Sequence, residues 1–180
     1  MLALDARVRL HAAGTQPVPL AIRPYPQELE SRLLVGGQEL QLRPIRPEDG
    51  ERQQDFYAQA SPADLRLRFF QSRREVPLSE LARFSQIDYD REMAFVALPA
   101  ADAQGRQPIA GEVRAVCDPD NEVAEFAIQV ASGWQGRGLG RLLLARLVEH
   151  LRERGTRELV GECLPENTAM AGLALSLIHI

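Results

Sequence analysis

Three glycines, each separated by one residue, stand in the stretch Trp134-Gln135-Gly136-Arg137-Gly138-Leu139-Gly140-Arg141. Residues 122–130 before it have the apolar content of a buried strand, and residues 142–154 after it have the period of an amphipathic helix that ends at Gly155. A glycine loop lets the backbone approach a ligand closely, and the start of the helix offers unpaired N–H groups and the positive end of its dipole. The stretch therefore predicts a site for a phosphate or pyrophosphate group.

The spacing of the glycines bears on which phosphate ligand this is. A P-loop ends in Gly-Lys-Ser/Thr, whereas Gly140 is followed by Arg141 and Leu142. The dinucleotide fingerprint is G-x-G-x-x-G and the spacing here is G-x-G-x-G, although Glu158 or Glu162 lies about twenty residues on, as that fingerprint requires. A nucleotide-binding fold and a plain turn between strand and helix stay open as alternatives.

The loop resembles the Q/R-x-x-G-x-G/A signature of the GNAT (Gcn5-related) N-acetyltransferases, carried here by Gln135-Gly136-Arg137-Gly138-Leu139-Gly140. The resemblance implies acetyl-CoA as the cosubstrate, with its pyrophosphate on the loop amides and its pantetheine arm along the preceding strand. The Val130 amide would polarise the thioester carbonyl. Asn167 opens the last helix as a CoA contact or as a plain N-cap. The implied cofactor-binding residues are Ile128, Gln129, Val130, Gln135, Gly136, Arg137, Gly138, Leu139, Gly140, Arg141 and Asn167.

Transfer of an acetyl group to an amine requires that the amine lose a proton, and free lysine titrates near pH 10.4. Glu125 is the candidate base, because its strand is apolar on both faces apart from Gln129 and partial burial would raise the carboxyl pKa. A base glutamate in the Ala-Glu-Phe-Ala segment is also what the resemblance implies. An exposed or arginine-paired carboxylate is the alternative, and Glu112 and Glu162 are the fallback bases. No tyrosine lies in the last helix to serve as the acid that many relatives use.

Composition limits the class of protein. The chain has 180 residues, a formal net charge of -4 and a sequence pI near 5.5, so we expect neither a nucleic-acid nor a membrane partner. The two cysteines, Cys117 and Cys163, are too few for a disulfide framework and are expected to be small core residues in a reducing cytoplasm. No metal-ligand spacing is visible.

The predicted elements form an α/β fold (α+β in some schemes), a mixed and mostly antiparallel sheet flanked by helices. A hairpin turns at Gly36-Gly37, the strand before the glycine loop and the one after the helix form a βαβ unit, and the closing C-terminal strands of a GNAT fold are missing. In the second helix, Leu65, Phe69 and Phe70 should face the core. The predicted strands are 31–35, 38–43, 93–98, 109–117, 122–130 and 158–164, and the helices are 47–60, one from Ser61, 78–86, 142–154 and one from Thr168.

Within the superfamily, the chain resembles the C-terminal domain of Pat-type bacterial protein lysine acetyltransferases, in which that domain follows an NDP-forming acyl-CoA synthetase-like region. The stretches that carry this resemblance are 42–49, 67–70, 86–94, 124–127 and 159–162. We expect a fragment truncated at both ends. The predicted divisions are 1–10, a remnant strand of a preceding ATP-grasp domain or alternatively an ordinary first strand; 11–29, a proline-rich linker; 30–174, the GNAT domain; and 175–180, a non-native tail or alternatively a native apolar end.

The function implied is acetyl-CoA-dependent acetylation of protein lysines by direct attack of the amine on the thioester, with an acyl-CoA synthetase as one candidate acceptor. A small-molecule amine acetyltransferase and a non-catalytic CoA-binding regulatory module are the alternatives. Without the closing strands we expect the chain to be a poor catalyst.

Overall fold

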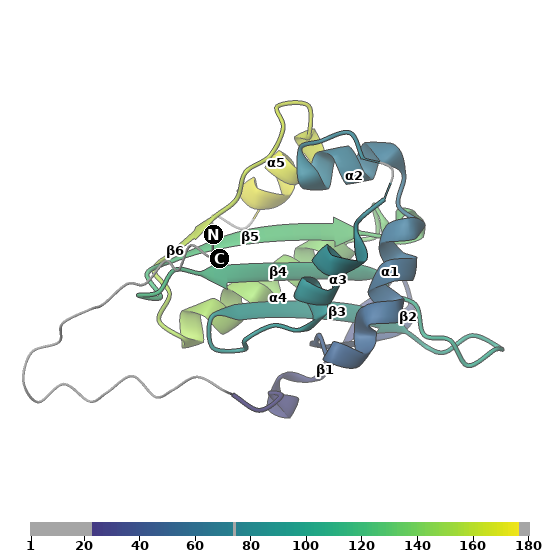
Figure 1. Cartoon of the computed structure of the whole chain (residues 1–180), viewed down its shortest axis with the longest axis horizontal. Coiled ribbons are helices and arrows are strands. Elements are labelled where there is room, and N and C mark those ends of the chain that lie inside the picture. The colour runs from purple at the N-terminus through teal and green to yellow at the C-terminus, as the bar shows by residue number, and fades with distance from the viewer. Residues whose placement is uncertain (1–22, 74, 177–180) are drawn as a thin grey trace, which may run out of the picture.

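A twisted sheet of six strands in the order β1-β2-β3-β4-β5-β6 forms the centre of the molecule (Figure 1). The computed structural model describes residues 23–73 and 75–176. The first five strands are antiparallel neighbours and the sixth lies parallel to the fifth, which confirms the predicted mixed sheet. The strands are β1 (Ser31–Val35), β2 (Gln38–Pro44), β3 (Glu92–Pro99), β4 (Gly111–Cys117), β5 (Val123–Val130) and β6 (Glu158–Val160).

Helices cover both faces of the sheet, so the protein has two cores. The long helix α4 packs on one face, and α1 and α3 lie on the other, with α2 over β5 (Figure 1). Strand β3 is buried on both faces, because Phe95 faces α4 while Val96 faces the opposite core. The helices are α1 (Gly50–Ala58), α2 (Pro62–Phe69), α3 (Leu78–Ser85), α4 (Leu139–Glu153) and α5 (Thr168–Leu175), with short 3-10 turns at Gln27–Leu29, Pro47–Asp49 and Ser132–Trp134.

The helix that follows the glycine loop is pressed closely against the sheet. It begins at Leu139, three residues before the predicted start, so that Leu139 joins the buried stripe, to which Leu143 also belongs. A Cβ atom at Gly111 would lie 2.9 Å from Leu143 Cδ1, so a larger residue in β4 would force the leucine side chains of the helix to shift. This packing fixes the position of the helix N-terminus relative to the end of β5.

Three predictions about packing were wrong. β6 ends at Val160 instead of residue 164, and the next residue, Gly161, packs so closely on the Phe126 ring that an added Cβ would be 2.4 Å from it. Cys163 is consequently exposed in the segment after β6, and Cys117 is half-buried. Phe70 caps α2 in the left-handed conformation, φ 59°, and is 44% exposed, whereas Leu65 is buried as predicted.

The described residues at the N-terminal side pack on the sheet domain. The Tyr25 hydroxyl donates to Glu30 Oε1 at 2.8 Å, and its ring meets Tyr89 edge-on with the Arg46 guanidinium 4.3 Å above it. The predicted remnant strand, most of the predicted linker, and residues 177–180 of the predicted tail lie outside the described residues. Among the residues the structure does describe, no helix has the length and apolarity to cross a bilayer.

Candidate functional site

A cavity of about 500 Å³ lies where the glycine loop, the start of α4, the end of β5 and α5 meet. All predicted cofactor-binding residues line it except Arg137, whose guanidinium instead lies 5.3 Å from the centroid of the Trp134 ring. The structure thus brings the end of β5, the loop and Asn167 to one place, although their role in binding stays a prediction. Lining residues that the sequence did not single out are Asp64, Leu67, Trp134, Ala169, Met170 and Leu173.

The start of α4 has the features of an anion site. Gly138 is the N-cap with φ 85°, it gives no side-chain hydrogen bond, and no acidic residue stands in the first turn. The N–H groups of the first turn have no partner within the helix, and Arg141 adds a positive charge where the helix dipole already favours an anion. These residues fit a pyrophosphate group.

The open edge of β5 offers backbone groups to the same cavity. The Ala131 amide donates to the Ala110 carbonyl at 2.9 Å, and the Asp118 amide donates to Val123 at 2.9 Å. Because bonded and non-bonded pairs alternate in an antiparallel ladder, the N–H and C=O groups of Ile128 and Val130 point away from β4, toward the cavity. Those of Gln129 point to β4, which corrects the expectation that its backbone binds pantetheine.

Strand β6, which lies parallel to β5, covers only the first part of the β5 edge. β6 pairs with β5 from Val123 to Glu125 only, where Glu125 stands opposite Val160. The outward groups of Phe126, Ile128 and Val130 therefore have no strand beside them among the described residues. A ligand with amide groups of its own fits such an edge.

Asn167 acts as the N-cap of α5, as one of the two interpretations predicted. Its Oδ1 accepts a hydrogen bond from the Met170 amide at 3.0 Å. Because Asn167 also lines the cavity and its Oδ1 is already bonded, its Nδ2 group is the part of the side chain that can donate to a ligand.

Glu125 lies on the surface, and the expectation of partial burial was wrong. The reason is that α1 and α3 pack over the middle of the sheet and leave this end of β5 uncovered. Glu125 borders a hollow beside the cavity, together with Arg114 and with Arg68, which lines both. It has no hydrogen bond or ion pair with the described residues.

The two fallback bases, Glu112 and Glu162, are less suitably placed than Glu125 to accept a proton from an acceptor amine. Glu112 is 2% exposed, and its two oxygens accept from Arg114 at 2.8 Å and from Gln53 Nε2 at 2.7 Å, so it is held as a structural carboxylate. Glu162 is exposed in the segment after β6 and borders neither the cavity nor the hollow beside it.

No acid for the leaving thiolate appears among the described residues that line the cavity. Its titratable side chains are those of Asp64, Arg68 and Arg141. Tyr57 is buried on the inner side of α1, and burial, followed by the charge of Glu112, raises the pKa of its hydroxyl well above the usual range. Within the described residues no group of His, Cys, Asp or Glu side chains is arranged to hold a metal ion.

Comparison with known proteins assigns the family. The Acetyltransferase (GNAT) family matches residues 60–177, which include the cavity residues of β5, the loop and α5. The chain belongs to this family. Acetyltransferase PA5475 of Pseudomonas aeruginosa is 33% identical to this GNAT domain over 144 residues, which are 80% of this chain and 76% of the relative.

Two relatives named Pat are also similar to this GNAT acetyltransferase. Acetyltransferase Pat of Mycolicibacterium smegmatis is 30% identical over 166 residues, which are 92% of this chain and 44% of that relative. The crystal structure of the GNAT domain of S. lividans PAT superposes with a TM-score of 0.75 at 28% identity, over 85% of this chain and 89% of that one.

A more distant structure shows the same fold with the cofactor present. RimL, a ribosomal L7/L12 alpha-N-protein acetyltransferase in complex with coenzyme A, has a TM-score of 0.63 at 18% identity, over 81% of this chain and 82% of its own. RimL therefore shows coenzyme A bound to a protein of the same fold.

Proposed function

We propose that the chain binds acetyl-CoA in the cavity beside β5 and transfers the acetyl group to a lysine side chain of a protein. The observation that carries the proposal is the meeting of two features in one cavity: the N-terminus of α4, where Gly138 offers no capping side chain, and the strand edge at which the backbone groups of Ile128 and the amide of Val130 point away from β4. The first suits a pyrophosphate and the second suits the amide-bearing pantetheine arm. The protein acceptor is inferred from the resemblance to Pat-type protein lysine acetyltransferases described above, and relatives named Pat match this chain.

In this proposal the chain's own groups bind and orient the cosubstrate. Amides of the first turn of α4, with Arg141, hold the pyrophosphate. Leu139, Met170 and Leu173 supply apolar wall, and the outward carbonyl and amide of Ile128 accept from and donate to the arm. An outward amide of β5 then polarises the thioester carbonyl, which makes its carbon electrophilic.

The acceptor amine attacks that carbon directly, the C–S bond breaks, and the thiolate leaves with the electron pair. The proton released by the amine passes through water to Glu125. Water is required because Val130 lies five residues beyond Glu125 on the strand, about 16 Å at roughly 3.3 Å per residue. The Ile128 amide, about 10 Å away on the same scale, is the outward amide better placed to work with this base.

Turnover with a panel of acceptors tests the proposal. Purified chain is incubated with acetyl-CoA and with a protein acyl-CoA synthetase, other lysine-bearing proteins, or small amines, and acetylated residues are identified by mass spectrometry. Acetyl-lysine in a protein is the expected product, and transfer to small amines alone would contradict the protein acceptor. Titration with CoA, ATP and NAD is run beside it. CoA binding without transfer to any acceptor would instead favour a non-catalytic module, an alternative supported by the exposed Glu125 and by the lack of an acid among the described residues of the cavity.

A further inference from the structure

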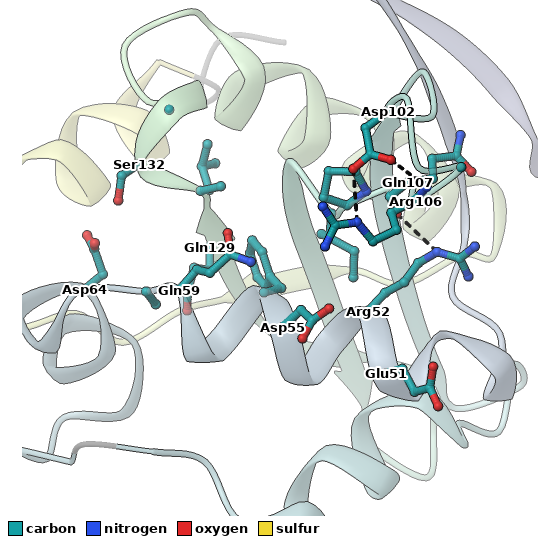
Figure 2. Close-up of a pocket in the computed structure, with 18 of the residues that line it drawn as sticks. Glu51, Arg52, Asp55, Gln59, Asp64, Asp102, Arg106, Gln107, Gln129 and Ser132 are labelled. Carbon is teal, nitrogen blue, oxygen red and sulfur yellow. Dashed lines mark hydrogen bonds and ion pairs between the residues drawn. The ribbon is translucent and has the colours of Figure 1, made fainter.

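Two hollows adjoin the cofactor cavity. The first, of about 620 Å³, lies between α1, the loop that joins β3 to β4, and the end of β5 (Figure 2). The second, the Glu125 hollow, has about 760 Å³ and lies between α3 and one end of β3, β4 and β5. Because Glu125 receives the proton of the acceptor amine in the proposed function, the acceptor must reach the second hollow.

The floor of the Glu125 hollow is a part of the sheet that no described helix covers. Glu92 stands opposite Val116 in the neighbouring strand, and Val116 stands opposite Glu125, so the three side chains share one face. Val116 is 47% exposed, although its strand lies inside the sheet. The floor thus offers an apolar surface beside the proposed base, which suits the methylene chain of a lysine.

Helix α3 forms the wall of this hollow and is fastened to the sheet by Arg114. The Arg114 guanidinium donates to the Phe84 carbonyl oxygen at 2.8 Å and lies 4.3 Å from the centroid of the Phe84 ring. It also pairs with the buried Glu112 at 2.8 Å, so its own charge is already balanced. These contacts with β4 set the position of α3, and with it the position of Arg83, the residue before Phe84.

Arg83 is exposed on this wall, and no carboxylate of the described residues pairs with it. Glu80, one turn earlier on α3, is at the right spacing, but both of its oxygens accept from Arg73 Nη1, at 3.2 and 2.9 Å. Arg68, which the Glu125 hollow shares with the cofactor cavity, likewise has no described carboxylate partner. The wall therefore carries unbalanced positive charge, whereas the floor carries carboxylates.

We propose that the Glu125 hollow receives the polypeptide segment that bears the acceptor lysine, and that Arg83 selects segments with an acidic residue close to that lysine. The lysine lies along Val116 with its amine toward Glu125, and the neighbouring carboxylate pairs with Arg83. Glu92 repels an acidic residue from the floor, which keeps that residue at the helix wall. This inference rests on the proposed function and deepens it, because it states which lysines of a protein are acetylated.

Acetyl transfer to matched peptides tests the selection. Each peptide carries one lysine and has Glu, Gln or Lys at one of the neighbouring positions. For the wild-type chain we expect kcat/KM to be about threefold higher with Glu than with Gln at the best position, as one exposed ion pair implies. Higher ionic strength should reduce this preference, because salt screens exposed charges.

Reversal of the charge at Arg83 is the decisive variant. Arg83→Glu should invert the preference, so that the peptide with a neighbouring Lys is acetylated faster than the one with Glu. The affinity for CoA should stay unchanged, because Arg83 does not border the cofactor cavity. Arg157→Glu replaces an exposed arginine that borders neither the cavity nor the Glu125 hollow, and this matched control should keep the wild-type preference.

Three results would overturn the selection by Arg83: equal kcat/KM for all peptides, an unchanged preference in Arg83→Glu, or a wild-type preference for a neighbouring Lys. The last result would favour entry through the hollow of Figure 2, where the carboxylates of Glu51 and Asp55 have no partner among the described residues.

Fluorescence anisotropy of labelled peptides with the CoA-loaded chain separates this inference from the proposed function. Binding that depends on the acidic neighbour and on Arg83, without acetylation of any peptide, would refute the transfer and retain the hollow. Acetylation of lysine peptides without any effect of the neighbouring residue would refute this inference alone. Absence of both peptide binding and acetylation, with CoA still bound, would refute both.

Discussion

The side-chain amide of Gln135 donates a hydrogen bond to the Val130 carbonyl oxygen at 3.1 Å and thereby joins the first residue of the glycine signature to the last residue of β5. The same Nε2 atom lies 3.2 Å from Asp64 Oδ1, at the start of α2. One side chain thus sets the position of the loop relative to the strand edge.

Replacement of this side chain should loosen the loop without unfolding the domain. We expect Gln135→Leu to weaken CoA binding roughly five- to tenfold, as loss of about one hydrogen bond's net free energy implies. Isothermal titration measures the affinity. Gln104→Leu, in the exposed loop between β3 and β4, is the matched control, and an equal effect of both substitutions would count against the role of Gln135.

A larger residue at Gly138 should cost both stability and affinity. The backbone there has φ 85°, a conformation that costs a residue with a Cβ about 1–2 kcal/mol, even though the added atom would meet nothing within 4 Å. We expect Gly138→Val to lower the free energy of unfolding by that amount in urea titrations and to remove measurable CoA binding. Gly133→Ala, in open space without a positive φ, should change neither quantity.

Removal of the Glu125 carboxylate should affect turnover and not cofactor affinity. For Glu125→Gln we expect kcat to fall at least tenfold with CoA affinity retained, and the remaining activity to require higher pH, where more of the amine is neutral. A pH–rate profile measures both effects. Glu162→Gln is the control, since that exposed residue lies away from the cavity. A wild-type profile for Glu125→Gln would exclude Glu125 as the base.

Stability should fall in mild acid because of His150. The ring is 7% exposed and lies edge-on to Phe95, and burial together with the charges of Arg154 and Arg146 lowers the pKa of its imidazole to about 4. Unfolded histidine titrates near 6.5, so the folded state loses stability as pH falls from about 6.5 to 4, by at most roughly 3 kcal/mol. Urea titrations at several pH values in this range should show that the free energy of unfolding depends less steeply on pH for His150→Leu than for wild type. An equal dependence on pH in the two proteins would contradict the role of His150.

Elements whose signals are local were predictable from the sequence. The Gly36-Gly37 hairpin and the helix predicted from Ser61 are examples, and the Ser61 hydroxyl, which begins the Ser-Pro-x-Asp sequence typical of a helix start, accepts from the Asp64 amide at 3.0 Å. The βαβ unit around the loop followed from periodicity. The close packing of Gly161 on the Phe126 ring was not predictable, because it joins residues 35 positions apart in the chain.

In the site too, local sequence features were predictable and features that depend on tertiary packing were not. The glycine signature located the cavity, since its residues are contiguous in the chain. The exposure of Glu125 was missed because it depends on how far α1 and α3 extend over the sheet. The unpartnered Gln129 oxygen was missed as well, because burial of one amide depends on the packing of α1, which no local pattern encodes.

Because β6 pairs with only the first part of β5, the rest of that strand edge is open to a ligand that forms hydrogen bonds with the backbone. Amide hydrogens of β5 should then exchange with deuterium in an alternating pattern. Those of Ala127 and Gln129 are slow, because β4 binds them, and those of Ile128 and Val130 are fast. A cosubstrate bound along this edge would slow the exchange of the Ile128 and Val130 amides and leave that of the Ala127 and Gln129 amides unchanged. Hydrogen exchange would therefore show which backbone groups of β5 the cofactor pairs with, as it would for an added strand.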